Sequence, residues 1–355
     1  MKSQEKVLGR YHLIQKLGQG ALGQVWEAKD EVLGRAVALK ALRQDLKIDA
    51  SEYRTIEARM DHEAKAAALL SHPGIIRLFD LGKDESYGLI LVFELVEGPT
   101  LEEALRQGRL TIDGVARIAD TIGDALGNAH EKGILHRDIK PANLMLTEEL
   151  PKVADFGVAH LPESTLTRSG ARVGTPAYSS PEVIVSGAHS PASDQFSLAA
   201  TLYEALSGKR AFPGRDATEV AQAIQRLHYQ PLAATLSLPS GVDTVLKRAL
   251  SRNPEDRYPS ARDFGGELHR ELTGGREVMP SFTDVRSQPS LAYTQPPSWS
   301  QRSAALAIAF MLGAGVTLVL ARWQSSKSSP PQEITPPSPS TLFLAAPPAA
   351  KMREE

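Results

Sequence analysis

The stretch that decides the fold is His136-Arg137-Asp138-Ile139-Lys140-Pro141-Ala142-Asn143. It places a carboxylate at Asp138, an ammonium at Lys140 and a carboxamide at Asn143 within one short loop. Phosphoryl transfer from ATP needs these three groups around the attacking hydroxyl: an acceptor for its proton, a cation on the γ-phosphate and a ligand for Mg²⁺. A solvated basic loop is the plain alternative, so the neighbouring motifs have to decide between the two.

This stretch resembles the catalytic loop of the protein kinase superfamily. The resemblance implies that Asp138 accepts or orients the proton of the substrate hydroxyl, that Lys140 neutralises the γ-phosphate and that Asn143 binds a metal ion. Histidine is the commonest general base by residue type, but the resemblance implies that His136 is packed and structural. Lys140 followed by Pro-Ala-Asn is the form typical of serine/threonine kinases.

A second motif, Asp155-Phe156-Gly157, follows twelve residues after Asn143, behind a short apolar strand. It matches the family's Asp-Phe-Gly motif, which implies that Asp155 is the second ligand of Mg²⁺, with Mn²⁺ as the alternative ion. Residues Gly174 to Glu182 resemble the end of an activation segment, the platform for a protein substrate, with Ser180 where the family usually has alanine. The resemblance also implies that Thr175 bridges Asp138 and Lys140, that Glu182 pairs with Arg257, and that Asp194 braces the catalytic loop.

Near the N-terminus, Leu17 to Val25 has the pattern Gly-x-Gly-x-x-Gly-x-Val. The pattern alone is weak, because dinucleotide-binding turns share it. Residues 25–28 favour a second strand instead of a helix, which places the glycines in a hairpin whose backbone N–H groups can approach phosphates closely. A plain hairpin without a ligand is the alternative. The predicted nucleotide contacts are Leu17, Gly18, Gly20, Gly23 and Val25.

Lys40 ends the apolar run Val37-Ala38-Leu39-Lys40, fifteen residues after Val25. The run resembles the kinase strand whose lysine contacts the α- and β-phosphates, and it assigns Ala38 to the same nucleotide site. Glu63 on the following predicted helix is the expected ion-pair partner of Lys40, because its spacing to His72-Pro73 matches the family. Glu57 on the same helix is the alternative partner.

Residues Leu91 to Gly98 end a strand and enter a connection that resembles the kinase hinge. Adenine is recognised there by backbone groups, so side-chain identity is weakly informative. Position assigns the Glu94 carbonyl and the Val96 amide to the adenine contacts, Phe93 to the gatekeeper position and Met145 to the floor under the ring. A strand end with no ligand is the alternative.

Periodicity within the first 272 residues changes once. Short alternating or β-branched runs occupy 11–42 and 76–96, whereas helical spacing dominates later segments such as 112–129 and 196–206, and a helix is also predicted over 51–70. This periodicity predicts a small sheet followed by a helical bundle. The resemblance implies that residues 11–272 form an α+β bilobal protein kinase fold, with a small β-rich N-terminal lobe and a larger helical C-terminal lobe.

The C-terminal third differs in composition. Residues 273–302 are rich in Ser, Pro, Thr and Gln, which predicts a disordered juxtamembrane linker. Residues 303–321 carry no charge and lie between Arg302 and Arg322. Such a helix is about 28 Å long, close to the hydrocarbon thickness of a bilayer, which predicts a single transmembrane helix. A buried core helix is the alternative, although a helix between two proline-rich segments has no core to enter. Residues 322–355 form a proline-rich tail.

The predicted orientation places the kinase domain on the cytoplasmic side of the cell (inner) membrane. The count of positive charges beside the span slightly favours the opposite orientation. No secretory signal is expected at the N-terminus, the domain needs cytosolic ATP, and a large folded domain is harder to export than a short tail. Small residues at Ala305, Ala309 and Gly313 share one helical face and predict a homodimer contact.

Charge and cysteine content exclude other classes of function. A formal net charge of −2 argues against a nucleic-acid partner bound through phosphates. The absence of cysteine rules out disulfides and disfavours a structural zinc site.

The resemblance therefore implies a eukaryotic-like (Hanks-type) serine/threonine protein kinase of the membrane-anchored type common in bacteria. Such an enzyme uses ATP and Mg²⁺ to phosphorylate Ser/Thr hydroxyls of protein substrates, and we expect autophosphorylation at Thr165, Thr167 or Ser169. Two alternatives are a pseudokinase that acts as a signalling scaffold and a small-molecule phosphotransferase of related fold.

Overall fold

A computed structural model describes residues 6–19, 23–42, 49–108, 110–156 and 176–276. In these ranges no helix is both long and apolar enough to cross a membrane. The predicted span at 303–321 and the tail lie outside the described residues, as does nearly all of the predicted linker, so these remain predictions.

The N-terminal part is an antiparallel sheet with the strand order β1-β2-β3-β4-β6-β5. In β4, Val37, Leu39 and Ala41 alternate toward the buried face, as the pleat of a half-buried strand requires. This confirms the predicted small sheet. The strands are β1 (Lys6–Val7), β2 (Tyr11–Gln19), β3 (Gly23–Asp30), β4 (Arg35–Leu42), β5 (Leu78–Asp84) and β6 (Gly88–Glu94).

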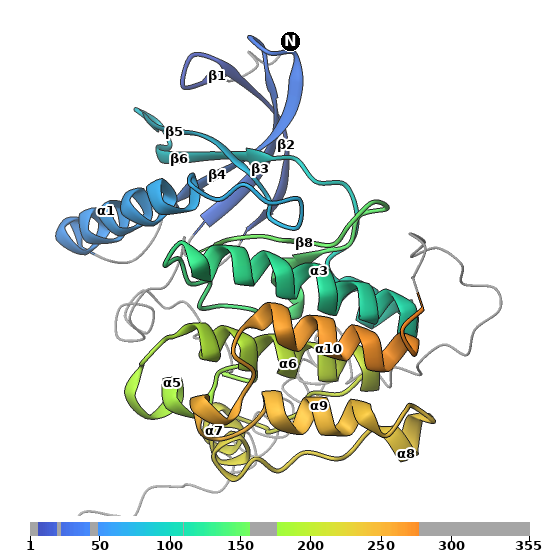
Figure 1. Ribbon diagram of the computed structural model, residues 1–355. Helices are drawn as coiled ribbons and strands as arrows, with labels where there is room; N and C mark the ends of the chain where they lie inside the picture. The colour runs from blue at the N-terminus through green and yellow to red at the C-terminus, as the bar shows by residue number, and fades with distance from the viewer. Residues whose placement is uncertain (1–5, 20–22, 43–48, 109, 157–175, 277–355) are drawn as a thin grey trace, which may run out of the picture. The chain divides into compact units, whose positions relative to one another are not determined.

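Helix α1 (Ala50–Ala67) lies against β5 and β6 (Figure 1). It begins where the Asp49 carboxylate accepts hydrogen bonds from the backbone amides of Ser51 and Glu52, which satisfies two of the free amides of the first turn. Its apolar face, Ile56, Met60 and Ala64, packs on Leu89 and Leu91 of β6. The helix ends three residues earlier than the predicted range of 51–70.

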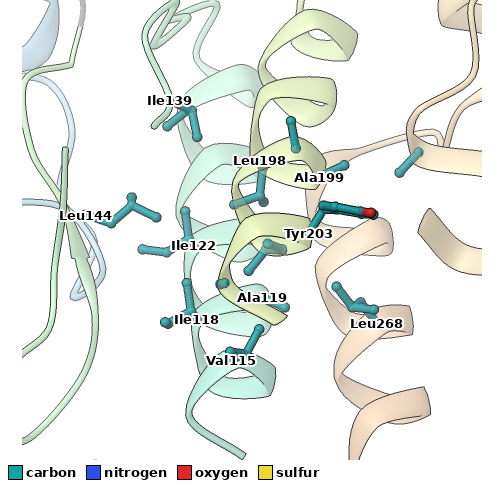
Figure 2. Packing of buried hydrophobic residues seen from close by; sticks show 14 of the residues in the cluster. Val115, Ile118, Ala119, Ile122, Ile139, Leu144, Leu198, Ala199, Tyr203 and Leu268 are labelled. Carbon is teal, nitrogen blue, oxygen red and sulfur yellow. The ribbon is translucent and has the colours of Figure 1, made fainter. Parts of the chain in front are cut away.

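The C-terminal part is helical around α6 (Pro191–Ser207), which is buried on nearly every side. Figure 2 shows how α3, α6 and α10 interdigitate: Ile122 of α3, Leu198 of α6 and Leu268 of α10 belong to the same cluster. The helices are α2 (Leu101–Gln107), α3 (Ile112–Glu131), α5 (Pro181–Ser186), α6, α7 (Ala217–Arg226), α8 (Ala233–Leu236), α9 (Gly241–Ala249) and α10 (Ala261–Thr273), with 3-10 turns η1 (Pro141–Asn143) and η2 (Pro254–Asp256).

Helices α3 and α10 approach each other closely at two glycines. A Cβ atom on Gly265 would lie 2.2 Å from the carbonyl oxygen of Ala119, and one on Gly123 would lie 2.7 Å from that of Ala261. Only glycine fits at either position. The close contact fixes α3, and the catalytic loop begins directly after this helix.

A short ribbon of β7 (Leu144–Met145) and β8 (Lys152–Val153) joins the two parts. The Ile76 amide donates to the Val153 carbonyl at 3.0 Å, and the Val153 amide donates to the Gly74 carbonyl at 2.8 Å. The ribbon therefore ties the chain that precedes β5 to the segment between Asn143 and Asp155.

Candidate active site

The polar groups of the catalytic loop lie together. Lys140 Nζ donates to Asp138 Oδ2 at 2.7 Å, and Asn143 Nδ2 donates to the same oxygen at 3.0 Å and to the Asp138 carbonyl at 2.7 Å. Pro141 opens the turn η1, which brings Asn143 back toward Asp138. The Asp138 side chain remains 56% exposed, so a substrate hydroxyl can reach its carboxylate.

Asp194 holds this loop from beneath. Its carboxylate accepts hydrogen bonds from the backbone amides of His136 and Arg137, both at 2.8 Å, and lies 2.9 Å from His130 Nε2. Burial alone would raise the pKa of Asp194, but these partners outweigh it and hold the pKa below its ordinary value. Arg137 has φ +69°, a strained value that the two fixed amides maintain. The predicted brace is confirmed.

His136 is packed, as expected. Its Nε2 lies 2.7 Å from the carbonyl oxygen of Ala154, which can only accept, so Nε2 carries the proton. Its Nδ1 accepts a hydrogen bond from the Asp138 amide at 3.2 Å, and its ring meets Phe156 edge-on. Both ring nitrogens are used by the backbone, which excludes the general-base alternative.

Asn143 and Asp155, the predicted metal ligands, are held close together by the backbone. The amide of Ala154, directly before Asp155, donates to the Asn143 carbonyl at 2.9 Å. Asp155 has φ +60°, which is uncommon for a residue with a side chain and turns it out of the strand direction. The hydrogen bonds recorded for the Asn143 side chain use its nitrogen, so the carboxamide oxygen can serve as a ligand. An amide oxygen beside a carboxylate suits Mg²⁺.

Lys40 neutralises Asp155 across the site, with its Nζ 2.6 Å from Asp155 Oδ1. Desolvation would raise the pKa of Asp155, but the ammonium of Lys40, together with His136 and Lys140, outweighs it and holds the pKa below its ordinary value. The side chain of Glu63 lies outside the described residues. The Glu57 carboxylate, the alternative partner, pairs with Lys83 at 2.8 Å.

The glycine-rich stretch connects two strands of one sheet. Gly18 lies opposite Val25 and Gln19 opposite Gln24 in the β2–β3 register, so the motif is a hairpin, and a strand-to-helix dinucleotide turn is excluded. Gly20 lies outside the described residues. Leu17 is 49% exposed.

Residues assigned to the nucleotide site form two pairs across neighbouring strands. Val25 of β3 pairs directly with Lys40 of β4, and Ala38 of β4 pairs with Phe93 of β6. Side chains of directly paired residues project from the same face of a sheet. The register therefore brings these two parts of the assigned nucleotide site into adjoining strands.

The hinge residues leave the sheet at the end of β6. Glu94 is its last residue, and Val96 lies in the connection to α2. Met145 of β7 forms a bridge with Thr100, which brings the predicted floor residue beside the hinge. Sequence reasoning missed Lys152 of β8, whose Nζ contacts Glu94 Oε1 at 2.5 Å. A lysine in a short strand gives no signal of such a partner, because it is usually a solvated charge.

The end of the activation segment is fixed by an ion pair and by a hydrogen bond. Arg257 is fully buried and binds Glu182 through two hydrogen bonds of 2.7 and 2.8 Å, as predicted. Sequence reasoning missed a second contact, in which the Tyr178 hydroxyl donates to Glu204 of α6 at 2.6 Å. Thr165, Thr167, Ser169 and Thr175 lie outside the described residues.

Comparison with known proteins decides the family. The protein kinase domain family matches residues 11–264. The chain belongs to the protein kinase family. Bacterial serine/threonine-protein kinases are among its relatives. It is 37% identical over 282 residues to PknA of Mycobacterium tuberculosis, covering 78% of this chain and 64% of that protein. It is 35% identical over 291 residues to PknB of the same organism, covering 79% and 46%. The chain therefore spans less than two thirds of the length of these relatives.

Solved structures agree with the kinase fold. The kinase domain of Mycobacterium tuberculosis PknI matches 77% of this chain and 99% of its own, with a TM-score of 0.59 and 28% identity. A Rad53 structure matches 75% of this chain and 67% of its own, with a TM-score of 0.61 and 24% identity, which is a likeness of fold alone. The predicted β-rich N-terminal lobe and helical C-terminal lobe are thus confirmed.

Proposed function

We propose that this chain is an ATP-dependent serine/threonine protein kinase that phosphorylates hydroxyl groups of protein substrates. The observation that carries the proposal is the joint placement of Lys40 with Asp155 and of Lys140 and Asn143 with Asp138. The first pair supplies a phosphate cation and a metal carboxylate. The second supplies another phosphate cation and a metal amide, beside an exposed carboxylate that can receive a proton.

In the mechanism, a substrate Ser or Thr hydroxyl donates its proton toward Asp138 as its oxygen attacks the γ-phosphorus in line. Lys140 lies within reach of the same carboxylate and stabilises charge that develops on the transferred group. Asn143 and Asp155 would hold Mg²⁺, which when bound supplies charge neutralisation at the phosphates. Lys40 would exchange part of its contact with Asp155 for the α- and β-phosphates.

Two features favour a protein substrate over a small alcohol. The chain carries the segment that ends at Glu182, and the buried Arg257 holds this end in place. Its relatives PknA and PknB are named serine/threonine-protein kinases. A pseudokinase is disfavoured because Lys40, Asp138, Asn143 and Asp155 are all present.

The test is transfer of labelled phosphate from ATP to a generic protein substrate by the full chain in detergent. We expect Asp138→Asn to lower kcat by about 10³-fold, because the proton acceptor is lost, and to change the melting temperature little, because the side chain is 56% exposed. Lys65→Met serves as a surface control. A folded Asp138→Asn protein with near wild-type transfer would contradict the proposal, and transfer to small alcohols but not proteins would favour the small-molecule phosphotransferase.

We further propose that residues 303–321 anchor the kinase in the cell membrane, with the kinase domain in the cytoplasm and residues 322–355 outside. The uncharged stretch supports the span, and the need for cytosolic ATP supports the orientation. We expect protease added to intact spheroplasts to remove only the tail. Digestion of the kinase domain while the membrane is intact would reverse the orientation. The same span would carry the homodimer contact, and dimerisation would favour autophosphorylation in trans.

A further inference from the structure

Glu94, the last residue of β6, is held on two sides. Its Oε1 accepts a hydrogen bond from Lys152 Nζ at 2.5 Å, and its Oε2 accepts one from the Arg77 amide at 3.3 Å. Its own amide donates to the Arg77 carbonyl at 2.9 Å. The Lys152 and Glu94 side chains are only 19% and 30% exposed, so their ion pair is partly shielded from water and from screening by salt. The beginning of the hinge is therefore attached to β8.

The other end of the hinge rests on β7 and the residue after it. Gly98 has φ +136°, and a Cβ atom there would lie 2.1 Å from the carbonyl oxygen of Leu146. The Leu146 amide donates to the Pro99 carbonyl at 2.8 Å. The connection from Glu94 to Pro99 is thus fixed at both ends by the same ribbon, β7 with β8.

One cross-strand pair links these contacts to the predicted adenine site. Lys152 lies directly opposite Met145 in the β7–β8 register. Opposite residues project from the same face of an antiparallel pair. The residue assigned to the floor under adenine and the residue that binds Glu94 therefore belong to the same face of one two-stranded ribbon.

We propose that Lys152 is a positioning residue for adenine recognition. Through the Glu94 carboxylate, Lys152 sets the distance between the hinge backbone and Met145, the residue assigned to the floor of the adenine site. The space between them is thereby held wide enough for the adenine ring before the nucleotide binds. Preorganisation of this kind raises affinity by removing an ordering cost that binding would otherwise carry. The inference rests on the proposed function, because it takes ATP as the ligand of this site.

The test separates adenine binding from turnover in the full chain. Lys152→Met keeps the length of the side chain and removes its charge. We expect the KM for ATP and the inhibition constant of adenosine to rise together by about three- to fivefold, or ~0.7–1 kcal/mol, while kcat changes by less than about twofold. Adenosine carries no phosphate, so its inhibition constant reports on the adenine and ribose contacts without those of the phosphates. Lys152→Arg should restore both values.

Lys65→Met is the matched control, because it removes the same charge from an exposed ion pair with Asp61. Glu94→Gln removes the charge of the other partner in the ion pair, so it should reproduce the effect of Lys152→Met. Because both variants break the same contact, the double variant should raise the two constants no more than the single variant with the larger effect. This second route keeps the test valid if Lys152→Met fails to fold.

Wild-type inhibition by adenosine in folded Lys152→Met or Glu94→Gln protein would overturn the role of Lys152. So would a loss confined to kcat, or faster turnover with an unchanged KM. A wild-type chain that neither binds adenosine nor transfers phosphate would overturn the proposed function together with this inference. An active wild type with unaltered variants would overturn only the inference.

Discussion

The catalytic loop and the glycine hairpin are both assigned to ATP, yet they are built in opposite ways. The catalytic loop is held by Asp194, which is 1% exposed. The buried carboxylate of Asp194 accepts hydrogen bonds from two backbone amides of the loop. The hairpin strand β2 is exposed from Ile14 to Gln19, and its register with β3 shifts twice. Groups that stabilise the charge developing in the transition state are held in position before the reaction. A segment that covers a ligand has few buried contacts, so it opens at a low cost in free energy.

The largest effect should come from the buried support of the loop. Asp194→Asn keeps the shape of the side chain but replaces one acceptor oxygen with a donor, which leaves the amide of His136 or Arg137 without its partner. Such a loss in a buried network should lower the free energy of unfolding by roughly 3 kcal/mol. Chemical denaturation of the wild type and the variant measures the difference.

The same pair of proteins gives a test in acid. The pKa of Asp194 is held below its ordinary value, so its contribution to stability is fully present above the unfolded value of about 3.9 and is lost as the pH falls through the lower folded value. The stability difference between wild type and Asp194→Asn should therefore shrink on acidification. A difference that stays constant from neutral pH to pH 2.5 would show that the carboxylate does not anchor the loop.

Contacts between residues close in sequence could be predicted from the sequence itself, whereas contacts between distant residues could not. Asp138, Lys140 and Asn143 lie within one turn, so their meeting follows from local geometry. The contacts of Asp194 and Arg257 span more than fifty residues, and only the resemblance to a family suggested them.

Local signals that compete with periodicity were missed. The predicted helix over 196–206 begins five residues earlier, at Pro191, because the Ser190 capping box and a proline in the first turn set its start. The apolar pattern begins only at Phe196.

Lys152 and Tyr178 were missed because their partners lie on elements distant in sequence, and neither residue type signals a partner.

The smallest effect should come from the hairpin. Leu17 is 49% exposed, so Leu17→Ala removes little buried surface and should change the free energy of unfolding by less than about 0.5 kcal/mol. If Leu17 covers the nucleotide, its side chain buries apolar surface only when the nucleotide is bound. The KM for ATP should then rise about two- to threefold with kcat nearly unchanged, because ground state and transition state lose the contact equally.

Val32→Ala, in the exposed turn between β3 and β4, is the matched control and should leave both parameters unchanged. A destabilisation as large as that of Asp194→Asn would mean that the hairpin is part of the folded core, and the contrast between the two regions would not hold.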